Sequence, residues 1–146
     1  MNRSRSVRLI LCGLVVLLAL SACNAGGGPA IEATRGWLQS LADLDFKQVL
    51  AQTCSTPRVR NDVELRLDPL IDMQETLQSL KGQYDFSGLK FEELSNDGRV
   101  ATVRLSGKLL LKVLGQEQAF DIYEDVGVVK ESDTWKVCSN AANLLK

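Results

Sequence analysis

Sulfur provides the most reactive side chains of this sequence. The 146 residues include four cysteines and no histidine. Zinc sites and thiol catalysis usually draw on histidine or on closely spaced cysteines, and no two of these cysteines form a C-x-x-C pair. The sequence therefore disfavours a metal site, a catalytic thiol or a bound cofactor, so the cysteines need another explanation.

Cys23 has the sequence context of a lipid attachment site. It directly follows Leu20, Ser21 and Ala22, at the end of an apolar run over 9–20 that three arginines precede. A basic start, an apolar middle and small residues before a cut are typical of a secretory signal, and the cysteine makes the pattern that of a bacterial lipobox. In that pattern the thiol of Cys23 receives a diacylglyceryl group and the chain is cut before it. We predict a signal peptide over 1–22, with lipidated Cys23 opening a flexible tether over 23–29.

Two other interpretations of this segment are an ordinary cleaved secretion signal and an uncleaved anchor. The apolar run is too short to span a bilayer, and the glycines that follow Cys23 suit a tether. Two or more acyl chains on Cys23 would hold the protein stably to a membrane. We therefore expect an extracytoplasmic protein that is lipid-anchored to a bacterial cell membrane. Asn24 is not the aspartate of an inner-membrane retention signal, so the choice between inner and outer membrane stays open.

Cys54 and Cys138 are the cysteines left to form a pair, because Cys12 leaves with the signal peptide and Cys23 carries lipid. Two cysteines in an oxidising compartment most often bond to each other. Closing a loop of about 84 residues would stabilise the fold by about 4 kcal/mol. Two buried free thiols, or a metal or redox pair, are the alternatives. We predict a disulfide between Cys54 and Cys138.

The charge and length of the mature chain limit its partners. Seventeen basic residues minus the three arginines of the signal leave 14 against 18 acids, a net charge of −4. A nucleic-acid surface needs a clustered basic patch, so we expect no nucleic acid. About 120 residues are enough for one core, which predicts a single domain over 30–146.

Helical periodicity fills the first half of this domain. Pro29 suits a first helical turn, and apolar side chains then recur every three or four residues. Asp45 with Gln48 makes a capping box for a second, short helix. A third helical stretch is predicted over 61–81, bent or interrupted before Pro69.

Alternating periodicity replaces the helical one after Gly82. Strands beginning at Leu89 and covering 100–114, 118–130 and 134–139, with a turn at 96–98, predict an antiparallel meander. Gly107 lies within the longest strand and marks a bulge or bend that lets the strand curl. The sequence therefore predicts an α+β fold, with helices packed on a curled four-stranded sheet.

Glu124 is the acid whose position in this pattern could support catalysis. Strict alternation places it with Phe120, Ile122 and Val126 on the apolar face, where it could act as a base or a polar ligand contact. The favoured alternative is a bulge at Glu124 and Asp125 that puts both acids in water. Tyr123, Phe120 and Trp37 complete the candidate pocket, although Tyr123 is more simply a surface residue and the other two are more simply core.

The order of elements resembles the nuclear transport factor two-like superfamily, which includes ketosteroid isomerase. The resemblance is closest to its small secreted bacterial lipoproteins. It implies a cone-shaped α+β fold in which the helix bearing Cys54 packs near the last strand. The resembling segments are 37–41, 43–46, 53–55, and 128–131 leading into 135–138.

The resemblance implies a pocket without choosing its use, because relatives include both enzymes and binding proteins. We expect a non-enzymatic lipoprotein that binds a small apolar ligand or a partner protein near the membrane. An apolar pocket below about 300 Å³ would count against ligand binding. One alternative is an assembly role through a sheet-mediated homodimer, which requires a contiguous apolar patch on the outer face. The other is an isomerase or hydrolase that uses Glu124.

Overall fold

The computed structural model describes residues 27–80 and 82–139. The predicted signal peptide over 1–22 and the lipidation site Cys23 lie outside this part. No helix in the described ranges is long and apolar enough to cross a membrane. The elements are α2 (Pro29–Ala42), α3 (Phe46–Ala51), α4 (Pro57–Asp72), α5 (Gln74–Ser79), β1 (Gln83–Asp85), β2 (Leu89–Asn96), β3 (Val100–Val113), β4 (Gln116–Glu131) and β5 (Thr134–Val137).

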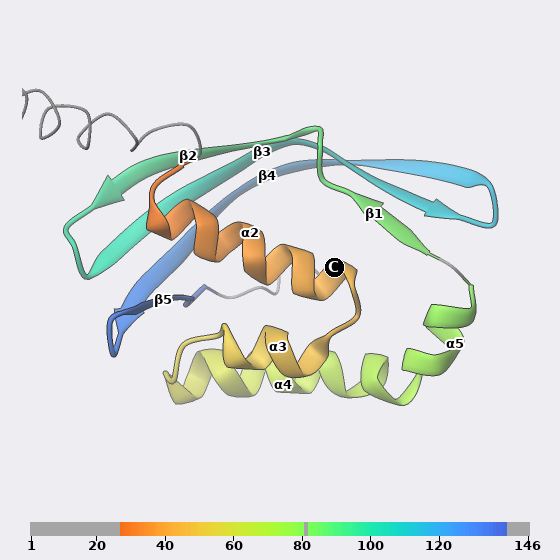
Figure 1. Ribbon diagram of the computed structural model, residues 1–146, viewed down its shortest axis with the longest axis horizontal. Helices are drawn as coiled ribbons and strands as arrows, with labels where there is room; N and C mark the ends of the chain where they lie inside the picture. The colour runs from red at the N-terminus through yellow and green to blue at the C-terminus, as the bar shows by residue number, and fades with distance from the viewer. Residues whose placement is uncertain (1–26, 81, 140–146) are drawn as a thin grey trace, which may run out of the picture.

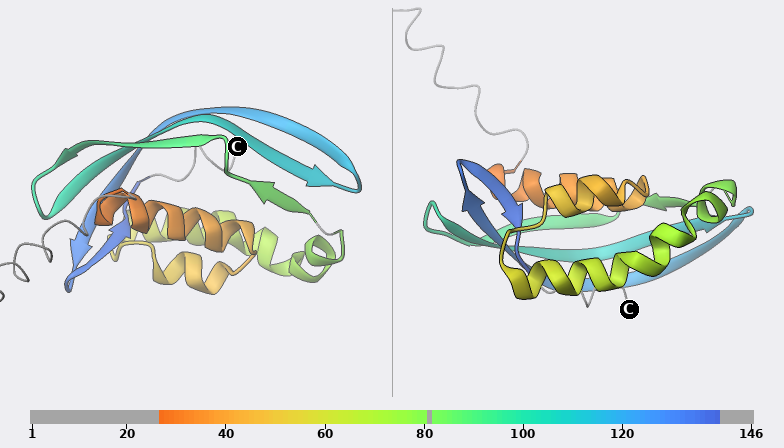
Figure 2. Two further views of the ribbon diagram at one scale, coloured as in Figure 1. Left: turned by 45° about the horizontal axis from the view of Figure 1, so that its top comes forward. Right: turned by 90° about the horizontal axis from the view of Figure 1, so that it is seen from below.

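The protein consists of a curled antiparallel sheet with helices on its concave side (Figure 1). Helix α2 lies directly under the sheet, and α3 and α4 lie below α2 in the same view. Seen from below, α4 runs along the sheet and leads to α5 at its far end (Figure 2). The predicted α+β class, with helices packed on a curled sheet, is confirmed. The buried core lies between these layers and includes Trp37, Val49, Val63, Leu67, Val103, Leu105 and Val128.

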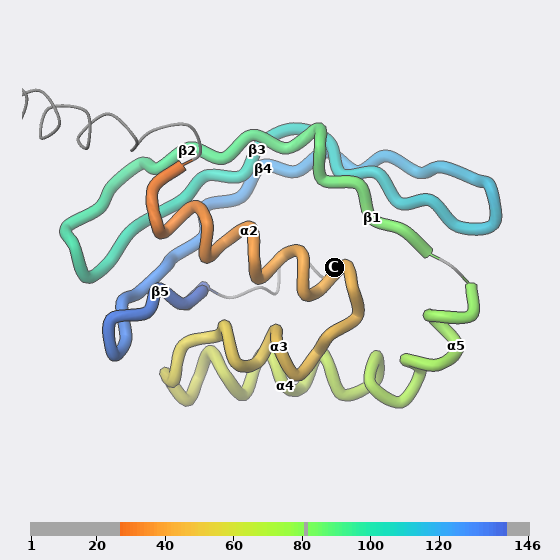
Figure 3. Tube along the Cα trace, viewed as in Figure 1, coloured from red at the N-terminus to blue at the C-terminus, as the bar shows by residue number. Residues whose placement is uncertain are grey.

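Strand β3 is the centre of the sheet. It pairs along its whole length with β4, and on its other side it pairs first with β2 and then with β1. The short β5 pairs with the end of β4 and closes the sheet on one side. Within residues 27–80 and 82–139 the sheet therefore has five strands rather than the predicted four, because β1 was not expected. The Cα trace in Figure 3 shows β2 and β1 succeeding each other beside β3.

The first two helices form where they were predicted. Pro29 opens α2, and Leu44 turns the chain after it with a positive φ of 57°. The side chain of Asp45 then accepts a hydrogen bond from the backbone N–H of Gln48 at 3.0 Å, which caps α3. The capping prediction thus identified the correct start of α3.

Helix α4 differs from its prediction in both its start and its break. It begins at Pro57 rather than near Asn61, because a proline fits the first helical turn. Pro69 lies inside the helix, which continues to Asp72. Pro69 has no N–H group, so the carbonyl of Leu65 receives no hydrogen bond from it. Leu65 lies on the exposed side of α4, where water can donate instead. The interruption comes four residues after Pro69, at Met73, and α5 follows it.

Gly107 marks the bend of the sheet, as predicted. Its φ is +124°, a value that side-chain-bearing residues rarely adopt. A Cβ atom there would lie 2.2 Å from the carbonyl oxygen of Gly88. The pairing of β3 with β2 ends at Gly107, and pairing with β1 begins at Leu110. The bend thus separates the part of β3 that pairs with β2 from the part that pairs with β1.

We expect Gly107→Ala to destabilise the fold by about 2–4 kcal/mol, because it adds backbone strain and a backbone clash. Urea unfolding with the disulfide intact measures this change. Gly98→Ala is the matched control, since Gly98 also has a positive φ but has open space around it, so the expected loss is only about 1 kcal/mol. Equal losses for the two variants would contradict the proposed close approach at Gly107.

Candidate functional site

An apolar cavity lies between the helices and the concave face of the sheet. Its volume is about 210 Å³. The end of α2, the end of α4, α5, β1 and the far half of β3 all contribute to its walls. None of its sixteen lining residues is charged; they are Leu38, Leu41, Leu44, Phe46, Leu70, Leu77, Leu80, Gly82, Tyr84, Phe86, Leu89, Leu105, Leu109, Leu111, Val113 and Ile122.

The two periodicities of the sequence build this cavity. Leu38 and Leu41 lie one turn apart on α2, and Leu109 and Leu111 lie on the same face of β3. The exposed rim includes Leu80 and Tyr84, the latter facing inward beside Leu111. The cavity can therefore surround an apolar group, while the sixteen residues that line it include no acid, imidazole or thiol for proton transfer or nucleophilic attack.

The sequence-predicted pocket residues lie elsewhere. Trp37 is buried and donates its Nε1 hydrogen to Thr53 Oγ1 at 3.0 Å. Phe120 is on the concave face opposite Leu109 but is not among the lining residues. Tyr123 is exposed on the convex face, where the Arg104 guanidinium lies 5.0 Å from its ring centre. None of these three side chains lines the apolar cavity.

Glu124 faces the concave side, and the expected bulge is absent. The pairing of β3 with β4 is regular from Val100 with Val129 to Val113 with Gln116, and it places Glu124 opposite Leu105. The prediction of a bulge at Glu124 and Asp125 was therefore wrong. Glu124 is nevertheless only half-buried and does not line the cavity. The described residues contain no cluster of three or more side chains suited to hold a metal.

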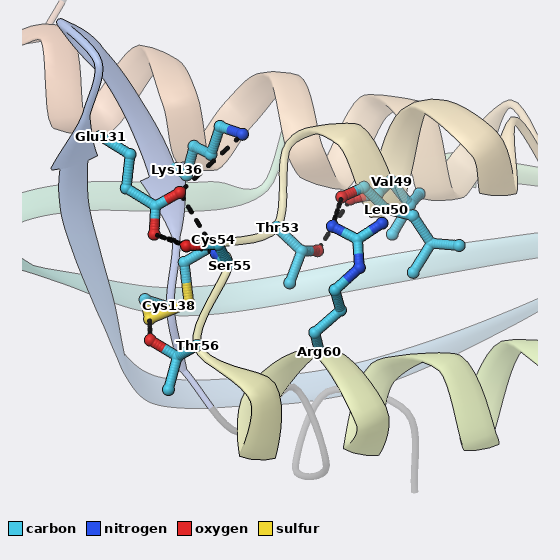
Figure 4. A network of polar contacts seen from close by, with 10 residues as sticks. All are labelled: Val49, Leu50, Thr53, Cys54, Ser55, Thr56, Arg60, Glu131, Lys136 and Cys138. Atoms are coloured by element: carbon cyan, nitrogen blue, oxygen red, sulfur yellow. Dashed lines mark hydrogen bonds and ion pairs between the residues drawn. A yellow bond between two sulfur atoms is a disulfide. The ribbon is translucent and has the colours of Figure 1, made fainter.

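A second polar and covalent site joins the helices to the sheet. We call it the Cys54 junction; it comprises residues 52–55 together with Glu131, Val137 and Cys138. Figure 4 shows Thr53, Cys54, Ser55, Glu131 and Cys138. The sulfur atoms of Cys54 and Cys138 are 2.04 Å apart, so the predicted disulfide is present. Cys54 N–H donates to the Val137 carbonyl at 2.9 Å, and Val137 N–H donates to the Gln52 carbonyl at 2.9 Å. This pairing at the outer edge of β5 brings Cys138 to Cys54 even though Val137 faces the core.

Glu131 completes the junction from the end of β4. Its carboxylate accepts hydrogen bonds from the Ser55 backbone N–H at 2.9 Å and from the Ser55 hydroxyl at 2.9 Å. The Nζ atom of Lys136 lies 3.9 Å from Glu131 Oε2. The backbone N–H of Ser55 is the main reason that the pKa of Glu131 is lowered, with the Ser55 hydroxyl and the Lys136 charge adding to it. The junction therefore favours the ionised form of Glu131.

The convex face of the sheet carries a ladder of ion pairs. The register places each pair directly opposite across β3 and β4, and Arg104 lowers the pKa of Asp125 by hydrogen bonding to it. The apolar residues Val100 and Leu110 are ten positions apart on β3, about 33 Å along a strand. They do not form the contiguous patch that a sheet-mediated dimer requires. The pairs are Arg104 with Asp125 at 2.8 Å, Lys108 with Asp121 at 2.7 Å and Lys112 with Glu117 at 3.5 Å.

No protein-family model matches the chain, and comparison with curated proteins finds no significant relative. A proposal for the function therefore rests on the lipobox-like segment of the sequence and on the geometry of the described residues.

We expect Glu131→Gln to destabilise the protein by about 1–2 kcal/mol at pH 7, because it weakens hydrogen bonds to a charged acceptor. The pKa of Glu131 is lower in the folded than in the unfolded state, so its contribution is present above the ordinary carboxyl pKa near 4.5 and is lost as the pH falls through the folded value. Thermal unfolding of both proteins between pH 3 and pH 7 measures this.

The matched control is Glu75→Gln, which neutralises an exposed acid in α5. We expect its stability to follow that of the wild type across the same pH range. A Glu131→Gln deficit that stays constant down to pH 3 would contradict the role of the ionised carboxylate.

Proposed function

We propose that this protein is an exported, lipid-anchored member of the nuclear transport factor two-like superfamily that binds a short alkyl chain without catalysing a reaction. The apolar cavity is the observation that carries this proposal. It is lined by residues of four helices and of the concave face of the sheet, and none of the described residues that line it is charged. A buried ligand there would be held by the hydrophobic effect rather than by polar recognition.

The volume of the cavity limits the ligand. About 210 Å³ is below the bound of about 300 Å³ for ordinary ligand pockets, so the volume counts against the predicted small-ligand binding and leaves only a ligand smaller than such pockets hold. It exceeds the roughly 150 Å³ of an engineered apolar cavity that accepts benzene. The size therefore favours a single hydrocarbon chain of moderate length.

The affinity expected for such a chain is modest. Burying seven methylenes of an octyl chain contributes about 5.6 kcal/mol at about 0.8 kcal/mol each. That corresponds to a Kd of about 0.1 mM before the cost of association weakens it further. We therefore expect 1-octanol to bind with a Kd in the range of about 0.1–1 mM.

The proposed anchor supports a ligand of this kind. Lipid on Cys23 would hold the domain close to a membrane, because only five residues lie between Cys23 and the start of α2 at Pro29. Molecules with alkyl chains are concentrated at that surface. The curled half-barrel with helices on its concave side also supports membership of the proposed superfamily.

The alternative functions have less support. An enzyme using Glu124 would need that carboxylate in the cavity, and Glu124 is not among the lining residues. A dimer through the convex face would have to bury three ion pairs on each copy, and removing those charges from water costs free energy. Ligand binding is therefore the function that we propose.

We expect Leu77→Trp to reduce octanol binding at least fivefold, because the larger ring fills the cavity from α5. A titration of the mature domain with 1-octanol, followed by chemical shifts of cavity methyl groups, measures the affinity. Leu65→Trp is the matched control on the exposed side of α4, outside the lining residues. Equal affinity in both variants would place the ligand elsewhere, and no binding to the wild type would refute the proposal.

We expect Cys23→Ser to abolish lipid attachment when the full chain is expressed in a bacterial host. The wild-type protein should lose residues 1–22, gain the mass of a lipid on Cys23 and partition into detergent. Cys12→Ser is the matched control within the signal segment, and it should leave all three properties unchanged. A Cys23→Ser protein that still acquires the lipid mass would contradict the predicted attachment site.

A further inference from the structure

A second hollow adjoins the apolar cavity on the other side of Leu38, Phe86 and Leu89. These three residues line both spaces, so the two spaces adjoin there. The second hollow has a volume of about 310 Å³ and lies between α2 and the start of β2. Its other lining residues are Arg35, Gln39, Ser87 and Phe91.

The second hollow has a mixed lining of polar and apolar side chains, whereas the lining of the first is apolar. Among the described residues, its lining includes one cation, Arg35, and no acidic side chain. The Arg35 guanidinium lies 4.7 Å from the centre of the Phe91 ring, and this cation–π contact holds the charge over the hollow. An anionic group placed there would meet a positioned guanidinium, which is well suited to carboxylate and phosphate oxygens.

The contacts that Arg35 makes within the protein leave its guanidinium able to bind a ligand. Within the described part of the chain it pairs with Glu32, whose Oε1 lies 3.9 Å from Arg35 Nη1. Both side chains are about half exposed, so the pair contributes little. Gln39 is already engaged, since its Nε2 donates to Asp43 at 2.9 Å. Arg35 is therefore the main charged donor that a ligand in the second hollow would meet.

We propose that the ligand is an amphiphile with one alkyl chain and an anionic head, whose chain occupies the apolar cavity and whose head binds Arg35. This inference rests on the proposed alkyl-chain function and specifies its ligand class. The adjoining hollows match the two parts of such a molecule, and the second one adds the space that the first lacks. A carboxylate and a phosphate head share the required chemistry.

The test compares ligands of equal chain length on the mature domain at pH 7.5. We expect octanoate, octyl phosphate or both to bind about fivefold more tightly than 1-octanol, a preference that should weaken as salt is raised. If only one anion shows this preference, its head group is the one selected. Arg35→Gln should remove the preference while leaving octanol affinity unchanged. Arg58→Gln, at an exposed arginine near the start of α4, should retain it.

The possible results distinguish a failure of the anionic-head proposal from a failure of the proposed alkyl-chain binding. If octanol binds as tightly as both anions, or if Arg35→Gln keeps the preference, the anionic head is refuted and the alkyl-chain function stands. If Arg58→Gln loses the preference as Arg35→Gln does, the effect is one of net charge and the Arg35 site is refuted. If none of the three ligands binds the wild type, both proposals fail.

Discussion

The junction at Cys54 is the constraint on which the rest of this structure depends. Helix α3 ends beside the outer edge of β5, and two backbone hydrogen bonds join residues 52–54 to Val137 there. The disulfide makes that contact covalent, and Trp37 of α2 reaches the same place through Thr53. One short segment thus ties two helices and the last strand together. Because α4 starts at Pro57, directly after this segment, the junction also fixes where α4 begins its path across the concave face.

The cavity follows from a mismatch in length that this arrangement creates. Both α2 and β3 contain 14 residues, but a helix of that length extends about 21 Å and a strand about 46 Å. With the helices fixed near β5, α2 cannot cover the far half of β3. The end of α2, the end of α4 and the small α5 border the space there, and their leucines line it without filling it. The bend at Gly107 curls the uncovered half toward the helices and so makes a cavity instead of an open face.

Local sequence predicted the elements better than it predicted the site. The cap at Asp45, the bend at Gly107 and the Cys54 pairing each have a short-range or compositional cause, and each is present. Strand β1 was missed because three residues are too few to show alternation, and its pairing with β3 is a tertiary effect. The leucines of the cavity were recognisable as apolar, but periodicity cannot distinguish a side chain that fills a core from one that borders an empty space.

Glu124 shows why alternation alone misjudges burial at a sheet edge. The alternation was correct, and the acid faces the concave side opposite the fully buried Leu105. Within the described residues, however, β5 pairs with β4 only from Val128 to Glu131, so no strand covers β4 beside Glu124. A long side chain at such an edge can turn its carboxylate toward water while its methylenes stay over the apolar face. No bulge is then needed to avoid a buried charge, and the regular register can persist along all of β4. The same register places a base of β3 opposite an acid of β4 three times on the convex face, which leaves that face with paired charges and the concave side with the cavity.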